Sequence, residues 1–179
     1  MSPDDRFSAC LAETESFEGG FSNDPFDPGG ATYRGVTQRA YDAWRRKQGS
    51  FLRGVAHASD DEISSIYREQ YWNAVRGDDL FAGLDMVAFD IAVNSGPICA
   101  IKFMQKGLDV VVDGYFGLET LGALQKVGNR AGLIQTICAM RLSYWRALTT
   151  WWRFGKGWAA RGVGVEEKAL SMLNQDSST

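Results

Sequence analysis

The chain has 179 residues, of which 45% are hydrophobic and 23% are charged. This length and balance exclude a large multidomain machine and a disordered chain, because there is enough apolar surface to form a core. There are 19 Lys and Arg residues and 22 Asp and Glu residues, so the net charge is −3. Since the chain has no excess of cations for a phosphate backbone, we expect no nucleic-acid partner.

The N-terminal half is predicted to be mainly helical. Apolar residues spaced by three or four predict a helix over about 4–18, which two glycines end. Turn-forming residues fill 21–35, so we expect an irregular loop there, with short strands near its end. Thr37 is expected to cap a second helix, and Ser59 with Glu62 forms the capping box of a third.

The C-terminal half is predicted to be helical as well, and Pro97 marks a natural boundary between two lobes. Helices are expected over about 84–94, from Pro97 to 104, over 118–124, from Asn129 to 148 and over 165–173, with a short hairpin over 110–116. Gly162 and Gly164 are expected to loosen the chain before the last helix. Asp90 lies within an apolar helix, where an unpaired carboxylate is costly, so an Arg partner is expected.

Histidine and cysteine usage limits the chemistry. His57 is the only histidine, whereas zinc hydrolase sites usually take two or three, and its surroundings lack a nucleophile-elbow pattern. Cys10, Cys99 and Cys138 are far apart and stand among apolar residues, which favours buried free thiols. We therefore expect no metal, no cofactor and no disulfide framework.

The first residues lack the basic start and apolar stretch of a secretory signal, so we expect synthesis in the cytoplasm without ordinary export. No run approaches the roughly 18 apolar residues that a membrane-spanning helix needs. The stretch 130–153 is expected to be a core helix rather than a helix lying on a membrane surface. We therefore predict no stable membrane insertion, with a monomer as the default state.

The segment most informative about chemistry begins at Glu18. Hydrolysis of a glycosidic bond needs a carboxylic acid beside the leaving oxygen, normally with a second carboxylate across the sugar. Two glycines after Glu18 leave an open approach, and a helix C-terminus would help to keep its carboxyl protonated. Asp24 and Asp27 follow in a loop that can fold back. Glu18 is the candidate acid, and one of these two aspartates is its candidate partner.

The run EGGFSNDPFDPGGAT at 18–32, followed by GVT at 35–37, resembles the signature of the peptidoglycan-cleaving muramidases of glycoside hydrolase family 108. FDIAVNSGP at 89–97 is similar to the middle of these proteins, and DGYFG at 113–117 to the predicted peptidoglycan-binding region that follows. The resemblance implies a mainly α, lysozyme-like fold with a short irregular or β-containing loop near the active site. It also implies cleavage of the β-1,4 bond between N-acetylmuramic acid and N-acetylglucosamine in peptidoglycan strands, with Glu18 as general acid.

On this basis we expect a muramidase lobe over 1–95, a helical peptidoglycan-binding lobe over 96–174 packed with it as one compact unit, and a polar tail over 175–179. Family members serve as phage endolysins or as muramidases that help bacterial proteins across the wall. The protein is thus expected to act in the periplasm, after release by a holin or by a dedicated export route. Two alternatives stay open: a lytic transglycosylase acting on the same bond, and a non-catalytic module that binds the wall or assists secretion.

Five residues are candidates for substrate binding. In phage-type lysozymes a Thr follows the catalytic Asp by six residues; counted from Asp27 that place holds Tyr33, with Thr32 directly before it. Tyr71 and Trp72 adjoin a predicted helix end and are the preferred rings for stacking on a sugar. Asn94 either hydrogen-bonds an N-acetyl group or only caps its helix.

Overall fold

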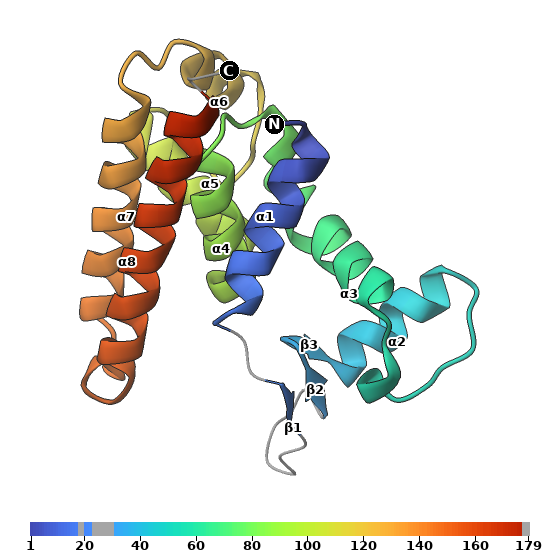
Figure 1. Cartoon of the computed structure of the whole chain (residues 1–179). Coiled ribbons are helices and arrows are strands. Elements are labelled where there is room, and N and C mark those ends of the chain that lie inside the picture. Colours follow the sequence, from blue (N-terminus) through green and yellow to red (C-terminus); the bar gives the residue numbers. More distant parts are fainter. Residues whose placement is uncertain (18–19, 23–30, 177–179) are drawn as a thin grey trace. The chain divides into compact units, whose positions relative to one another are not determined.

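The computed structural model describes residues 1–17, 20–22 and 31–176 (Figure 1). In this part of the chain there are eight α helices and one three-stranded sheet. The mainly α class with a short β-containing segment, predicted from the sequence, is therefore confirmed. The chain divides into two compact units, one made of residues 1–10 and 71–179 and the other of residues 11–70.

The smaller unit, residues 11–70, combines a small antiparallel sheet with short helices. Its elements are the end of α1 (Pro3–Glu15), β1 (Phe21–Ser22), β2 (Thr32–Tyr33), β3 (Val36–Thr37), α2 (Gln38–Lys47), η1 (Val55–His57) and α3 (Asp60–Tyr67). Thr37 caps α2 by accepting a hydrogen bond from the Ala40 amide at 3.2 Å. Ser59 and Glu62 form the predicted capping box at the start of α3. Both caps confirm the sequence analysis.

α1 ends at Glu15, three residues before the predicted end. The Ser16 hydroxyl donates a hydrogen bond to the Glu13 carbonyl at 2.6 Å, and the Phe17 amide donates one to the Thr14 carbonyl at 3.1 Å, so the chain leaves the helix in a turn. The dipole of a helix acts mainly within its last turn. The helix end predicted at position 18, on which the expected dipole effect depended, lies at Glu15 instead.

The larger unit is built around α4 (Leu84–Ser95), which packs against α5, α7 and α8 (Figure 1). Its other elements are η3 (Gly77–Asp79), α5 (Pro97–Gly107), α6 (Leu118–Gln125), α7 (Arg130–Arg146) and α8 (Trp151–Asp176), and η2 (Arg68–Trp72) leads into it. Every residue from Leu84 to Ala92 is buried, as expected for a helix that is apolar on all sides. Gly83 precedes α4 with a φ of 91°, and a Cβ there would collide with the Ala169 carbonyl of α8. Only glycine lets the two helices approach this closely.

Asp90 of α4 has the basic partners that the sequence predicts. Its carboxylate accepts from Arg161 of α8 at 2.8 Å and forms an ion pair with Arg141 of α7 at 2.6 Å. The Asp90 carboxylate is fully buried and both guanidinium groups are almost so. One negative and two positive charges thus tie three helices together in the core.

The predicted break before the last helix is wrong, because α8 runs unbroken from Trp151 to Asp176. Gly162 lies against the ring of Trp145, to which a Cβ would come within 3.2 Å, and Gly155 lies against Trp151. The glycines let aromatic side chains pack onto the helix. This packing outweighs their low helix propensity.

The predicted hairpin over 110–116 is also wrong, because residues 108–117 contain no strand. The Gln105 side chain holds this loop instead. Its amide nitrogen donates to Asp113 Oδ1 at 2.7 Å and to the Tyr115 carbonyl at 3.0 Å, while its oxygen accepts from the Gly114 amide at 2.8 Å. One buried side chain thus takes the place of strand pairing.

The two compact units divide the chain at 10/11 and 70/71, whereas the sequence analysis places the boundary between lobes at 95/96. The difference arises because α4 packs mainly against the helices that follow it. Residues on both sides of the predicted boundary therefore belong to the larger unit.

The three cysteines are free: Cys10 and Cys138 are buried, while Cys99 is partly exposed. Burial raises the pKa of Cys138 to about 12, so it stays a thiol. Among the described residues, no helix is long and apolar enough to cross a bilayer. The same residues hold no group of three or more His, Cys, Asp or Glu side chains suited to a metal ion.

Candidate active site

The three predicted catalytic residues, Glu18, Asp24 and Asp27, lie outside the described residues. The segments that contain them connect α1 to β1 and β1 to β2. The described frame of the candidate site therefore consists of the end of α1 and the small sheet, together with the side chains that hold these elements in place.

The sheet presents two chemically different faces. Phe21 pairs with Tyr33, which also pairs with Val36; Ser22 pairs with Thr32, which also pairs with Thr37. Paired residues on antiparallel strands share a face, and successive residues point to opposite faces. One face is therefore apolar and the other carries hydroxyl groups.

The two faces of the sheet separate the predicted binding residues Thr32 and Tyr33. Tyr33 shares a face with the buried Val36 and with Phe21, which is 55% exposed. Thr32 points to the opposite, hydroxyl-bearing face. Thr32 and Tyr33 therefore cannot both contact a ligand from the same side of the sheet. Phe21, which the sequence analysis did not select, becomes a candidate contact through its pairing with Tyr33.

A tight turn joins β2 to β3. Its two central residues, Arg34 and Gly35, have φ angles of 48° and 77°, the two positive values of a type I′ hairpin. The Tyr67 hydroxyl of α3 donates a hydrogen bond to the Arg34 carbonyl at 2.8 Å. The turn is thus held in register against α3.

The Arg34 side chain links three elements of the smaller unit. It binds Glu15 at the end of α1 at 2.6 Å, and it forms an ion pair with Asp60 at the start of α3. The hydrogen bond to Glu15 is the largest cause of an Arg34 pKa raised above its ordinary value. Because the chain leaves α1 directly after Glu15, this ion pair positions the point at which the segment carrying Glu18 begins.

A second polar cluster braces α2 against α3. The Tyr41 hydroxyl donates to Glu62 at 2.8 Å, and the guanidinium groups of Arg45 and Arg53 also bind Glu62. Burial alone would raise the pKa of Glu62, but hydrogen bonds from the Ser59 amide, Tyr41 and Arg53 outweigh it and lower that pKa. The cluster is a structural support, because each charge has a partner.

Tyr71 and Trp72 belong to the larger unit, where Trp72 is part of the core. Its side chain has no exposed surface, its indole nitrogen donates to Asp78 at 2.8 Å, and its ring contacts Phe7 and Phe89 edge-on. A ring without an exposed face cannot stack on a sugar, so the expected role does not fit Trp72 in this position. Tyr71 is partly exposed, and its role stays a prediction.

Asn94, the fifth predicted binding residue, is exposed near the end of α4 in the larger unit. Its side-chain oxygen accepts a hydrogen bond from the Ser95 hydroxyl at 3.0 Å. The next residue, Gly96, has a φ of 90° and joins α4 to α5. The contact with Ser95 is a local helix-end interaction, which leaves the Asn94 amide nitrogen for a ligand.

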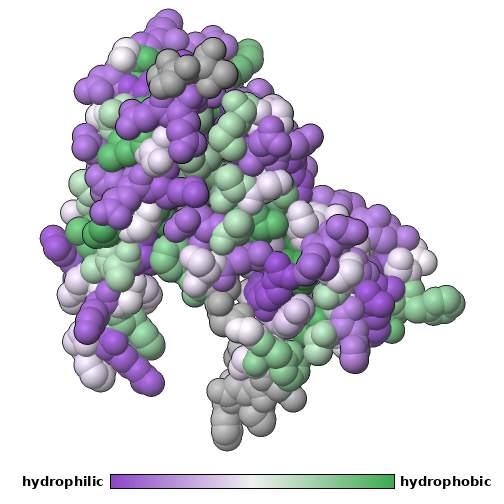
Figure 2. Space-filling model, viewed as in Figure 1, coloured by the Kyte–Doolittle hydropathy of each residue, from purple (hydrophilic) through white to green (hydrophobic). Residues whose placement is uncertain are grey.

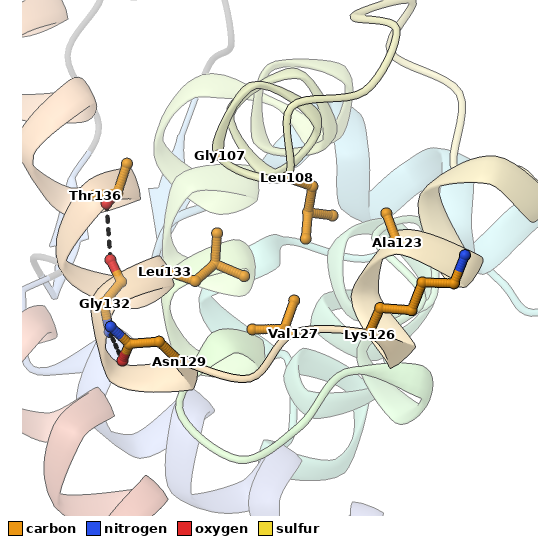
Figure 3. A pocket seen from close by; sticks show the side chains of 9 residues that line it. All are labelled: Gly107, Leu108, Ala123, Lys126, Val127, Asn129, Gly132, Leu133 and Thr136. Atoms are coloured by element: carbon orange, nitrogen blue, oxygen red, sulfur yellow. Dashed lines mark hydrogen bonds between the residues drawn. The ribbon is translucent and has the colours of Figure 1, made fainter.

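A pocket of about 420 Å³ lies in the larger unit where α5, α6 and α7 meet (Figure 3). Leu108, Val127 and Leu133 point into it, while the Lys126 amine points away. Asn129 beside it caps α7 by accepting from the Gly132 amide at 2.9 Å. No carboxylate lines this pocket, so it cannot supply the acid of a glycosidase.

Comparison with known proteins identifies the class. Residues 11–96 match the family model described as Glycosyl hydrolase 108. Among solved structures, the chain is similar to SagA of Brucella abortus, with 38% sequence identity and a TM-score of 0.79 over 93% of this chain and 95% of that one. A search of curated proteins found no match.

The protein is therefore a glycoside hydrolase of the peptidoglycan-degrading, lysozyme-like class. It belongs to glycosyl hydrolase family 108, and its family domain spans residues 11–96. All eight residues predicted for catalysis and substrate binding fall within this range. Phe21 and Arg34, which sequence reasoning did not select as functional, also lie within it.

Proposed function

We propose that the protein is an N-acetylmuramidase that hydrolyses the β-1,4 bond between N-acetylmuramic acid and N-acetylglucosamine in peptidoglycan strands. Glu18 protonates the leaving oxygen, and Asp27 or Asp24 stabilises the positive charge of the transition state or holds the attacking water. The observation that carries the proposal is that the family domain encloses the run from Glu18 to Asp27. On this proposal the protein acts as a monomer on the cell wall in the periplasm, after release by a holin or by dedicated export.

The products of wild-type digestion test this proposal. Purified peptidoglycan is incubated with the protein, and the soluble fragments are identified by mass spectrometry. A muramidase leaves reducing N-acetylmuramic acid ends. Anhydro-N-acetylmuramic acid ends would show a lytic transglycosylase instead. Binding to the wall without release of fragments would show a non-catalytic module.

The Arg34 ion pairs predict that substitutions of the three partners lower kcat to different extents. We expect Arg34→Met and Glu15→Gln to lower kcat roughly 10- to 100-fold, because a small displacement of a catalytic group is costly. Asp60 is 89% exposed, and exposed ion pairs contribute about 0–1 kcal/mol. We therefore expect Asp60→Asn to stay near wild type. Initial rates of fragment release measure the effect.

Urea unfolding of the same three variants separates positioning from stability. We expect Glu15→Gln to lower the free energy of unfolding more than Asp60→Asn, because Glu15 is 18% exposed and Asp60 is 89% exposed, but both variants to stay folded under assay conditions. Equal kcat values for these two variants would contradict a positioning role for the contact between Glu15 and Arg34.

A further inference from the structure

The end of the α7–α8 hairpin exposes large aromatic side chains. We call residues 143–157 the hairpin tip; they comprise the end of α7, the connecting loop and the first turns of α8 (Figure 1). In the tip Trp152 is 84% exposed and Phe154 is 45% exposed. Tryptophan is mostly buried in folded proteins, so such exposure needs an explanation.

The exposed rings of the tip lie beside a group of packed aromatic rings. Trp145 is buried, and its ring stacks on that of Trp158 at 6.1 Å. Trp158 also contacts the rings of Trp151 at 6.4 Å and Phe154 at 5.7 Å. Four aromatic rings thus form a small aromatic core, which is buried at Trp145 and partly exposed at Phe154. Trp152 stands outside this core on a helix that the core holds in place.

Positive charge surrounds the exposed rings. Arg146, Arg153 and Lys156 are all exposed in the tip, and the Arg153 guanidinium lies 5.2 Å from the centre of the Phe154 ring. Hydrophilic residues stand beside apolar ones at this end of the hairpin (Figure 2). The sequence holds no Asp or Glu from 130 to 165, although the whole chain has a net charge of −3. The tip is therefore a local cationic surface on an acidic protein.

The chemistry of the tip distinguishes two classes of partner. A glycan presents many hydroxyl groups, for which carboxylate and amide side chains are suitable hydrogen-bonding partners. The tip contains no Asp, Glu, Asn or Gln. Tryptophan rings and cations without acidic neighbours suit the boundary between acyl chains and negatively charged headgroups. The observations therefore favour a lipid surface over a sugar chain.

We propose that the hairpin tip binds the surface of a membrane that contains anionic phospholipids. Trp152 and Phe154 enter the headgroup region, while Arg146, Arg153 and Lys156 bind the phosphates. The contact is peripheral and reversible, and the rest of α7 keeps its buried place in the core of the larger unit. It would hold the protein at the membrane independently of the hydrolysis proposed above.

Sedimentation with vesicles tests the proposal with the full-length protein. We expect wild type to bind vesicles of phosphatidylethanolamine and phosphatidylglycerol but not vesicles of phosphatidylcholine alone, and to be released as salt rises. The double variant R153E/K156E should bind at least roughly 30-fold more weakly, since each basic residue near an anionic surface strengthens binding about fivefold and the two glutamates add repulsion. W152Q should also bind more weakly and lose the blue shift of tryptophan fluorescence that vesicles cause.

Two control variants match these changes elsewhere. K106E/K126E makes the same change in net charge at exposed residues outside the tip, and F51Q removes a side chain that is 94% exposed in the smaller unit. Both should bind vesicles like wild type, and all variants should cleave soluble peptidoglycan fragments at the wild-type rate. Failure of wild type to bind the anionic vesicles would overturn the proposal. An equal loss of vesicle binding in the two control variants would also overturn it. So would a W152Q variant that binds vesicles normally and is impaired only on insoluble peptidoglycan.

Discussion

Glu18→Gln should abolish most peptidoglycan hydrolysis while the protein stays folded. A positioned general acid contributes roughly 10²- to 10⁴-fold to the rate, and glutamine keeps the size of the side chain but has no acidic proton to transfer. Initial rates of reducing-end release measure the loss. Circular dichroism should match wild type, because Glu18 lies beyond the end of α1.

Three further variants make this test specific. Glu119→Gln applies the same chemical change to an exposed residue of α6 in the larger unit and should leave the rate unchanged. Asp24→Asn and Asp27→Asn should differ, with a large loss for the aspartate that assists Glu18 and a small loss for the other. A Glu18→Gln rate close to wild type would assign the acid to another residue.

Asp90→Asn should cause the largest loss of stability. The substitution removes the buried anion with which both Arg141 and Arg161, themselves nearly buried, form ion pairs. Removing one partner of a buried ion pair typically costs about 3–5 kcal/mol, a large part of the roughly 5–15 kcal/mol that stabilises a whole protein. We expect a similar fall in the free energy of unfolding, measured in urea at neutral pH.

Removing one of the two arginines gives a sharper comparison. Asp90 pairs with both arginines, and burial lowers the pKa of Arg141. Arg141→Met should therefore cost less than Asp90→Asn, because it leaves Asp90 paired with Arg161. As a control, Asp79→Asn breaks the exposed pair with Arg76 and should cost at most about 1 kcal/mol. A larger loss for Arg141→Met than for Asp90→Asn would contradict this account.

Local features of the fold were predictable because their causes lie within a few residues. The Thr37 cap and the Ser59 and Glu62 capping box depend on side chains that reach amides three positions away. The helix from Pro97 was predictable for the same reason. The need for a basic partner at Asp90 also followed from local context, since a carboxylate in an apolar helix must be compensated.

Features set by distant packing were predicted wrongly or missed. Gly162 suggested a break before the last helix, yet it receives the ring of Trp145, whose position no local pattern reveals. The loop after α5 suggested a hairpin, yet the buried Gln105 side chain satisfies its backbone instead. Trp72 adjoined a helix end and suggested an exposed ring, but the contacts with Phe7 and Phe89 place it in the core.

The sequence by itself indicated the class of chemistry, because the run from Glu18 to Thr32 resembles the signature of family 108. Only the tertiary structure decided which side chains support that run. Arg34 joins Glu15 to Asp60 across 19 and 26 residues of chain, and the pairing of Phe21 with Tyr33 sets the faces of the sheet. Such contacts depend on the path of the whole chain, so no short pattern encodes them.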